Sequence, residues 1–252
     1  MPTVTLRRFF IDPGRLQPER PSLEGEEAKH ILRVLRLGPG DRIVLFDNTG
    51  WEYEAQITGR QSGQVFFEVL GKKWVPRESP LRITLAVPLI RPQPLEWIYQ
   101  KGTELGVHSF YPYYSRYSGR NFSSQEWEDK QERWKRIITV AAKQCGRNRL
   151  PELMAPGSFE QVLETGDPAL RILPYEGENV YTLKEIADRY PETGRVMACI
   201  GPEGGFSPEE VRRAEEKNFF TISLGPRILR AETAVLTLIG LLQYLWGDLG
   251  GN

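Results

Sequence analysis

The stretch Val196-Met-Ala-Cys-Ile-Gly-Pro-Glu-Gly-Gly-Phe-Ser-Pro-Glu-Glu210 predicts a strand, a tight loop and the start of a helix in direct succession. Val196–Ile200 is a short, continuous apolar run of the kind found in buried strands. Ser207 is a favoured N-cap, Pro208 suits the first helical position, and Glu210 completes a capping box. This order is typical of an α/β fold that binds a ligand at the carboxyl end of a strand.

A second glycine loop follows the next predicted strand. The run Thr221–Leu224 ends at Gly225-Pro226, and Arg227-Ile-Leu-Arg-Ala-Glu-Thr233 then enters a helix that is apolar almost all round. An earlier strand ends at Leu173-Pro-Tyr175, which gives a third candidate wall of the same pocket. Because a helix that is apolar on all sides must be buried, we expect a core or a subunit interface to hold Val235, Leu238, Ile239, Leu242, Leu245 and Trp246.

The ligand that these loops favour is not a phosphate. The spacing Gly-x-x-x-x-Gly-Lys-Ser/Thr is absent, the spacing Gly-x-Gly-x-x-Gly is absent, and Glu203 brings negative charge to the loop. A nucleotide hydrolase is therefore disfavoured. S-adenosylmethionine fits better, because its sulfonium is positive and its adenine can be held by backbone groups of an apolar crevice. Taken alone, the loop after Ile200 is equally compatible with a structural turn.

The remaining sequence divides into two regions by its pattern. Residues 1–73 contain short strand-like runs separated by turn residues, with one short helix over Gly25–Leu37, and predict a small β-rich domain. Residues 74–80 are predicted to be a linker. Over residues 81–252, strand-like runs alternate with helical ones, among them a long helix from about Gln125 to Arg147. This alternation favours a mainly parallel sheet covered by helices.

The composition is typical of a soluble globular protein: 252 residues, 40% hydrophobic, with a formal net charge of zero. The longest apolar candidate, Val235–Trp246, is interrupted by polar residues and glycine, so we expect no membrane span. The polar, arginine-containing N-terminus does not resemble a secretory signal, which favours the cytoplasm. Two cysteines and two histidines show no zinc spacing, and we expect no metal.

The zero net charge conceals an uneven distribution along the chain. From Arg116 to Arg149 there are nine Lys or Arg against four Asp or Glu, whereas from Leu150 to Phe220 there are seven against fourteen. One region could therefore face the phosphates of a nucleic acid.

Two groups of basic residues could form that surface. On a helical wheel, Arg136, Lys143 and Arg147 share one predicted solvent-facing stripe of the long helix. A stripe of this kind is usually only a solvated face, but other basic residues nearby and in the β-rich domain favour contact with RNA. The candidates are Arg7, Arg8, His30, Arg33, Arg36, Arg116, Arg120, Arg136, Lys143 and Arg147.

An ordered set of motifs extends over nearly the whole chain. It consists of Arg7-Arg8-Phe9-Phe10, His30-Ile-Leu-Arg-Val-Leu-Arg36 before Gly40-Asp41, Lys101-Gly-Thr-Glu-Leu-Gly106, Glu132-Arg-Trp134, Gln144-Cys-Gly-Arg147, Ile200-Gly-Pro-Glu-Gly-Gly205 and Leu224-Gly-Pro-Arg-Ile-Leu-Arg-Ala-Glu-Thr233. The set resembles the RsmE-type methyltransferases of the SPOUT superfamily, which methylate N3 of a uridine in small-subunit (16S) ribosomal RNA.

The resemblance implies an N-terminal PUA-like β-barrel and a C-terminal SPOUT α/β domain with a parallel sheet and a deep trefoil knot. It also implies a homodimer that acts on ribosomal RNA or on the assembled small ribosomal subunit, with S-adenosylmethionine as the methyl donor. Three loops would bind that donor through Leu173, Pro174, Tyr175, Ile200, Gly201, Glu203, Gly204, Gly205, Leu224, Gly225, Ile228, Leu229, Arg230 and Thr233.

Methylation at a uridine N3 makes two demands on the protein. The N3 proton must leave, and the negative charge that develops on the base must be stabilised. Arg230 is the candidate for stabilising that charge and Glu232, or water, for accepting the proton, although Arg230 could equally be a capping or ion-pairing residue. Two other functions remain open: another SPOUT reaction such as ribose 2′-O-methylation, and a non-catalytic role in binding RNA or the ribosome.

Overall fold

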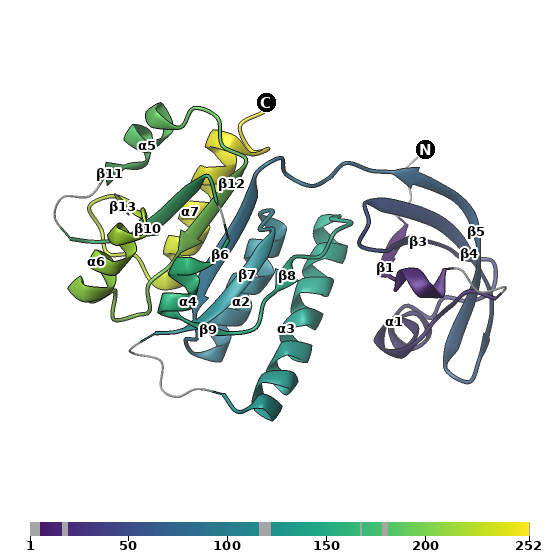
Figure 1. Ribbon diagram of the computed structural model, residues 1–252. Coiled ribbons are helices and arrows are strands. Elements are labelled where there is room, and N and C mark those ends of the chain that lie inside the picture. Colours follow the sequence, from purple (N-terminus) through teal and green to yellow (C-terminus); the bar gives the residue numbers. More distant parts are fainter. Residues whose placement is uncertain (1–5, 17–19, 116–121, 167, 178–180, 252) are drawn as a thin grey trace. The chain divides into compact units, whose positions relative to one another are not determined.

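The computed structural model describes residues 6–16, 20–115, 122–166, 168–177 and 181–251 (Figure 1). By their internal contacts the residues form two compact units. The first unit comprises residues 1–78 and 142–150, and the second comprises residues 79–141 and 151–252. The short segment 142–150 thus packs with the first unit, although nothing in its hydrophobic pattern indicated this.

The first unit is built on a five-stranded sheet in the order β1-β3-β4-β5-β2. β1 runs parallel to β3, and the other neighbouring pairs are antiparallel. The strands are β1 (Arg7–Phe10), β2 (Ser22–Leu23), β3 (Arg42–Phe46), β4 (Trp51–Gln61) and β5 (Gln64–Trp74). One side of the sheet packs on a core that includes Phe9, Ile31, Ile43, Leu45 and Phe67.

The helix predicted over Gly25–Leu37 forms, but in two parts. α1 (Gly25–Lys29) continues into the π-helical segment η2 (His30–Leu35), which ends at Arg36 in the left-handed region at φ 54°. Ala28 and Ile31 face the core and fix the position of the segment. The wider turn was not predicted, because apolar spacing over so few residues does not distinguish an α-helix from a π-helix. A short 3-10 turn, η1 (Pro13–Arg15), precedes it.

The second unit contains an eight-stranded sheet in the order β11-β13-β10-β12-β6-β7-β8, with β9 pairing to β7. Every recorded pair of strands is parallel. The prediction of an α/β fold with a mainly parallel sheet is therefore confirmed. The strands are β6 (Arg82–Pro88), β7 (Ser109–Tyr114), β8 (Glu152–Leu153), β9 (Gly157–Ser158), β10 (Leu170–Pro174), β11 (Tyr181–Thr182), β12 (Arg195–Cys199) and β13 (Phe220–Ser223).

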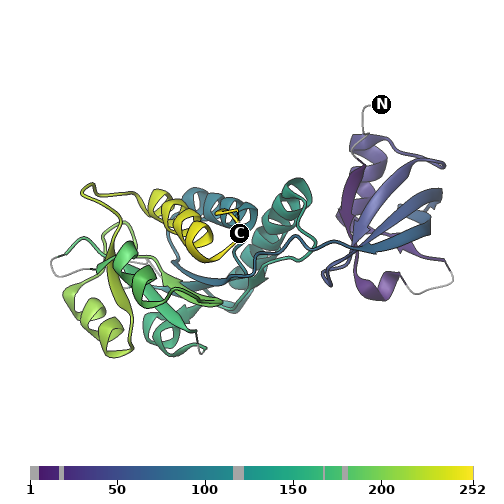
Figure 2. The same cartoon turned by 90° about the horizontal axis from the view of Figure 1, so that it is seen from above.

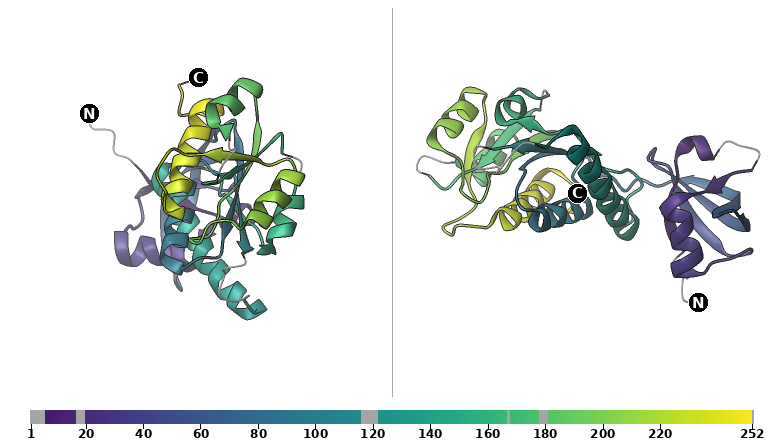
Figure 3. Two further views of the ribbon diagram at one scale, coloured as in Figure 1. Left: turned by 90° about the vertical axis from the view of Figure 1, so that its left-hand side faces the viewer. Right: turned by 90° about the horizontal axis from the view of Figure 1, so that it is seen from below.

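Helices cover both faces of this sheet. Views from above and below show α2 and α7 side by side on one face and α4 and α6 on the other (Figures 2 and 3). The predicted capping box at Ser207 and Glu210 is present, and similar boxes begin α4 and α5. The helices are α2 (Pro92–Glu104), α3 (Ser124–Cys145), α4 (Phe159–Glu164), α5 (Leu183–Arg189), α6 (Pro208–Glu216) and α7 (Ala231–Trp246).

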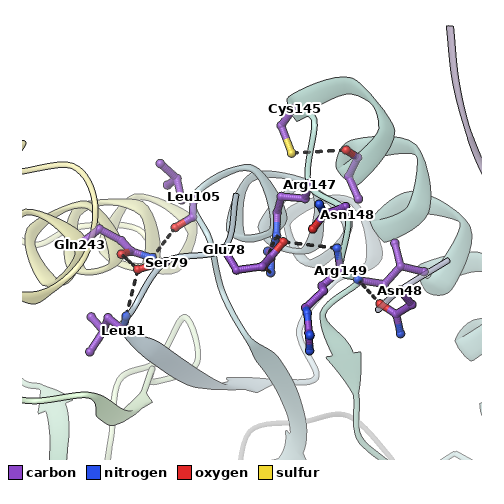
Figure 4. A network of polar contacts seen from close by, with 12 residues as sticks. Asn48, Glu78, Ser79, Leu81, Leu105, Cys145, Arg147, Asn148, Arg149 and Gln243 are labelled. Atoms are coloured by element: carbon purple, nitrogen blue, oxygen red, sulfur yellow. Dashed lines mark hydrogen bonds and ion pairs between the residues drawn. The ribbon is translucent and has the colours of Figure 1, made fainter. Parts of the chain in front are cut away.

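The C-terminal helix α7 is buried along most of its length, as its apolar sequence predicts. Its one fully buried polar residue among those described, Gln243, is satisfied on both sides: its Nε2 donates to the carbonyl of Leu105 at 3.0 Å, and its Oε1 accepts from Ser79 at 2.6 Å (Figure 4). Leu241 and Tyr244, in contrast, remain 40% and 62% exposed. The helix therefore has one side that the rest of the chain does not cover.

Candidate functional site

Three adjacent strands bring the predicted loops to one edge of the sheet. β10 lies between β12 and β13 and pairs in parallel with both, through Ile172 opposite Ala198 and Pro174 opposite Ile222. The carboxyl ends of parallel strands meet at the same edge, so the loops that follow these strands are neighbours. This register agrees with the expectation that the loops are neighbours, while their joint role as the walls of one pocket stays a prediction.

The loop after β12 is a tight turn held at both ends. The amide of Gly205 donates to the carbonyl of Pro202 at 2.9 Å, and Gly205 has a φ of 71°. A Cβ on Gly201 would lie 3.1 Å from the Phe206 ring, so glycine allows the loop to close on itself. At the start of the loop, the hydroxyl of Tyr113 donates to the carbonyl of Ile200 at 2.6 Å. Tyr113 was not among the residues predicted for the site.

The loop after β13 exposes both apolar side chains and backbone. Gly225, at φ 109°, donates its amide to the Ser223 hydroxyl at 3.1 Å. Ile228 is 82% exposed, which is unusual for an isoleucine. α7 then begins at Ala231 without a side-chain cap from Arg230, so its first amides are not satisfied from that residue.

The predicted donor-binding residues differ in what they can offer a ligand. Leu173 and Ile200 are buried in the core, so only their backbone atoms can line a site. The other predicted residues keep some exposure: Pro174, Tyr175, Gly201, Glu203, Gly204, Gly205, Leu224, Gly225, Ile228, Leu229, Arg230 and Thr233. No described atom lies within 4 Å of a Cβ built on Gly205 or Gly225, so the space beside both glycines is open.

Charged side chains of both signs lie on and beside these loops. Glu203 on the first loop lies 3.8 Å from Arg91, which is 85% exposed at the start of α2. Arg91 was missed by the sequence reasoning, although it closely follows β6, the strand beside β12. Arg230 is exposed, and within the described part of the chain its side chain has no recorded hydrogen bond or ion pair. Nothing recorded there joins Arg230 to Glu232, which is partly exposed.

The prediction that Arg136, Lys143 and Arg147 form a solvent-facing stripe is wrong. Arg136 is exposed, but Lys143 lies 2.9 Å from Glu27 with a side chain only 13% exposed. Arg147 is buried and donates to Glu78 at 2.6 Å (Figure 4). The helix predicted to continue to Arg147 ends at Cys145, so Arg147 lies beyond it. Segment 142–150 packs within the first unit, whose acidic residues neutralise Lys143 and Arg147.

Further contacts fix the same segment within the first unit. Arg8, another predicted RNA contact, is paired with the buried carboxylate of Glu52 at 2.5 Å and donates to the carbonyl of Arg147 at 3.0 Å. The Asn148 side chain donates to the carbonyls of Gly50 at 3.0 Å and Val75 at 2.6 Å. These residues serve the packing of the first unit, so contact with RNA is not needed to account for their presence.

The other predicted RNA contacts have different surroundings. Arg7, Arg33 and Arg36 are exposed on the first unit. His30 is partly buried, with its ring edge-on to Phe9 at a centroid distance of 5.9 Å. Arg116 and Arg120 lie outside the described residues.

Two further features are absent from the described ranges. In the described ranges, no group of three or more His, Cys, Asp or Glu is placed to hold a metal ion. None of the helices in those ranges combines the length and the apolar character needed to cross a membrane.

Comparison with known proteins identifies the family. Residues 77–243 match the model of an RNA methyltransferase domain, and residues 23–70 match that of an RNA methyltransferase PUA domain. The chain belongs to this RNA methyltransferase family. The resemblance to RsmE-type enzymes is thereby confirmed, together with the fold of a PUA-like first unit and a parallel α/β second unit.

Individual members of the RNA methyltransferase family match the chain over nearly its whole length. Ribosomal RNA small subunit methyltransferase E of Bacillus subtilis is 34% identical over 95% of this chain and 96% of its own, and that of Buchnera aphidicola from Schizaphis graminum is 32% identical over 90% and 92%. The crystal structure of the Neisseria gonorrhoeae protein of the same name, bound to S-adenosyl methionine, superposes with a TM-score of 0.87 at 31% identity, covering 97% of this chain and 99% of that one.

Proposed function

We propose that this protein transfers a methyl group from S-adenosylmethionine to N3 of a specific uridine in small-subunit ribosomal RNA. The observation that carries the proposal is the meeting of three loops at the carboxyl ends of β10, β12 and β13, where exposed backbone, open glycine surfaces and an exposed isoleucine lie together. The relative from Neisseria gonorrhoeae, solved with S-adenosyl methionine, supports the choice of donor.

The residues of these loops suit that donor chemically. The open faces of Gly205 and Gly225 allow a flat ring to approach the backbone, and Ile228 offers it an apolar contact. The carboxylate of Glu203 suits the positive sulfonium, and the uncapped first turn of α7 suits an anionic carboxylate. When bound, the donor supplies an electrophilic methyl group for an in-line displacement.

The protein's own part in the reaction is to orient the base and to stabilise its charge. Removal of the N3 proton leaves negative charge spread over N3, O2 and O4 of the uracil, and a fixed guanidinium would stabilise it. We assign that role to Arg230, which lies at the end of the third loop, exposed and without a recorded partner in the described residues. Glu232, two residues further in the first turn of α7, or water accepts the proton.

Recognition of the RNA is assigned to the exposed basic residues. Arg7, Arg33 and Arg36 on the first unit and Arg136 on α3 are free of recorded ion pairs among the described residues, so they can contact phosphates. The substrate is ribosomal RNA or the assembled small subunit. The proposal also includes the trefoil knot and a cytoplasmic homodimer, in which a second copy would cover the exposed side of α7.

Analysis of ribosomal RNA tests the reaction. In a strain that lacks the gene, mass spectrometry of nucleosides from small-subunit RNA should show the loss of one N3-methyluridine, and the purified protein with S-adenosylmethionine should restore it. An unchanged content of this nucleoside would refute the proposal. Loss of a ribose 2′-O-methyl group instead would indicate another reaction of the same fold, and failure to bind the donor would favour a non-catalytic role in RNA binding.

A further inference from the structure

The peptide that opens the loop after β12 has an unusual hydrogen-bond partner. The amide of Ile200 continues the sheet by donating to Ala86 of β6 at 3.0 Å, but β12 has already ended at Cys199. The carbonyl of Ile200 instead accepts from the hydroxyl of Tyr113 at 2.6 Å. Tyr113 lies on β7, on the other side of β6 from β12, so its side chain bridges one strand to reach this carbonyl.

This bond fixes more than one atom. A trans peptide is planar, and its C=O and N–H point in opposite directions. With the Ile200 carbonyl held against Tyr113, the amide of Gly201 points to the opposite side of the same plane. The orientation of the first amide of the loop is therefore set by a hydroxyl that the loop does not itself contain.

The tyrosine is itself held rigidly. Tyr113 is fully buried, its ring lies 5.7 Å from that of Phe159, and Phe159 lies 5.6 Å from Phe206 at the end of the loop. Both ends of the loop are thus in contact with the same aromatic cluster of Tyr113, Phe159 and Phe206. Burial also raises the pKa of the Tyr113 phenol well above its ordinary value, so the hydroxyl stays protonated and remains a donor at neutral pH.

A second tyrosine of the same unit provides a natural contrast. Tyr99 on α2 is also fully buried, yet its hydroxyl has no hydrogen-bond partner among the described residues. Both residues therefore place a phenol in the core, but only that of Tyr113 is bonded to the loop. Removal of each hydroxyl separates the effect of this bond from the effect of altering a buried tyrosine.

We propose that Tyr113 is a positioning residue for the methyl-donor loop, holding the Ile200–Gly201 peptide in the orientation that binds S-adenosylmethionine. The proposal rests on the function proposed above. Tyr113 does not contact the reacting atoms in this account. It acts through the backbone of the loop, so its loss affects the affinity for the donor rather than the affinity for RNA.

The test compares Tyr113→Phe with Tyr99→Phe in the full chain. Calorimetric titration with S-adenosylmethionine should show the dissociation constant raised about tenfold in Tyr113→Phe and changed less than about twofold in Tyr99→Phe, as expected for one buried hydrogen bond. The KM for the donor should rise with it, while kcat at saturating donor and the affinity for an RNA fragment stay within about twofold. A purely structural role would not give this division between KM and kcat.

Each other outcome has a defined meaning. Equal donor affinities of the two variants, with donor binding intact in the wild-type protein, would overturn the role of Tyr113 and leave the proposed function standing. No donor binding by the wild-type protein would refute the proposed function itself. If Tyr113→Phe fails to fold while Tyr99→Phe folds, the hydroxyl holds the core together rather than orienting the loop, and the proposal is overturned.

Discussion

The two sets of residues that the sequence singled out, the donor loops and the basic residues, differ in how they appear in the structure. The residues of the loops lie together at one edge of the parallel sheet and keep exposed backbone and side chains. Among the basic residues, Arg8, Lys143 and Arg147 are instead paired with acidic residues of the first unit. A glycine in a strand-to-helix turn is thus a more reliable indicator of an open site than is a basic side chain.

The physical reason lies in what each residue type requires. A glycine at positive φ is needed by the local backbone, so its role follows from its immediate neighbours. An arginine is satisfied by any carboxylate that the fold brings near, whatever the separation in sequence. Glu78 and Arg147 are 69 residues apart, and no periodic pattern could have paired them.

The largest expected effect is on stability and follows from the pair of Arg147 and Glu78. Substitution Arg147→Met should lower the free energy of unfolding by about 3 kcal/mol, because it leaves the largely buried Glu78 carboxylate without its partner. Guanidinium unfolding followed by circular dichroism and tryptophan fluorescence measures this. Arg136→Met, at an exposed position on α3, is the control and should change stability by less than about 0.5 kcal/mol.

Unchanged stability would instead favour the prediction that the basic residues of this region contact RNA. If Arg147→Met left stability unchanged but weakened the binding of an RNA fragment, the residue would be an RNA contact and its pairing with Glu78 incidental. The double variant Arg147→Met with Glu78→Met should recover part of the lost stability, because neither charge is then left unpaired.

The next largest effect concerns the loop after β13, one of the proposed donor loops. Arg230→Ala should lower kcat for RNA methylation about 100-fold, since it removes the cation assigned to the charge on the uracil. Arg227→Ala, three residues earlier in the same exposed loop, is the matched control and should lower kcat less than about threefold. Equal losses in the two variants would show that positive charge in the loop matters only in general, and the catalytic role of Arg230 would be withdrawn.

The smallest effect distinguishes exposed basic residues from paired ones. Arg33→Ala should weaken binding of an RNA fragment a few-fold and reduce the slope of log affinity against log salt concentration by about 1, as expected for one lost phosphate contact. Lys143→Met should leave that slope unchanged, because its charge is already neutralised by Glu27. Fluorescence anisotropy at several salt concentrations measures both slopes, and equal slopes would contradict the distinction between exposed and paired basic residues.

Local features of the fold could be predicted from the sequence. The strands predicted over Val196–Ile200 and Thr221–Leu224 form as Arg195–Cys199 and Phe220–Ser223, and the capping box at Ser207 forms as expected. α4 (Phe159–Glu164) was missed because its six residues carry too little periodicity, although its capping residues Ser158 and Gln161 are visible in the sequence.

The candidate site could be predicted only as far as neighbouring residues define it. The three loops were found because each directly follows a strand, and parallel strands bring their carboxyl ends together. Tyr113 and Arg91 were missed because they reach the loop from elements on or beyond β6. Contacts of that kind depend on strand order, and the spacing of apolar residues does not predict strand order.

Titration of the purified protein with S-adenosylmethionine tests the central claim most directly, namely that the loops after β10, β12 and β13 form the site of the methyl donor. The wild-type protein should bind the donor, and Gly225→Val should bind it at least tenfold more weakly, because valine is strained at φ 109° and fills the open space beside the loop. Gly194→Val, at the start of β12 on the opposite edge of the sheet, should bind like the wild-type protein. Undiminished binding by the folded Gly225→Val variant would contradict the account.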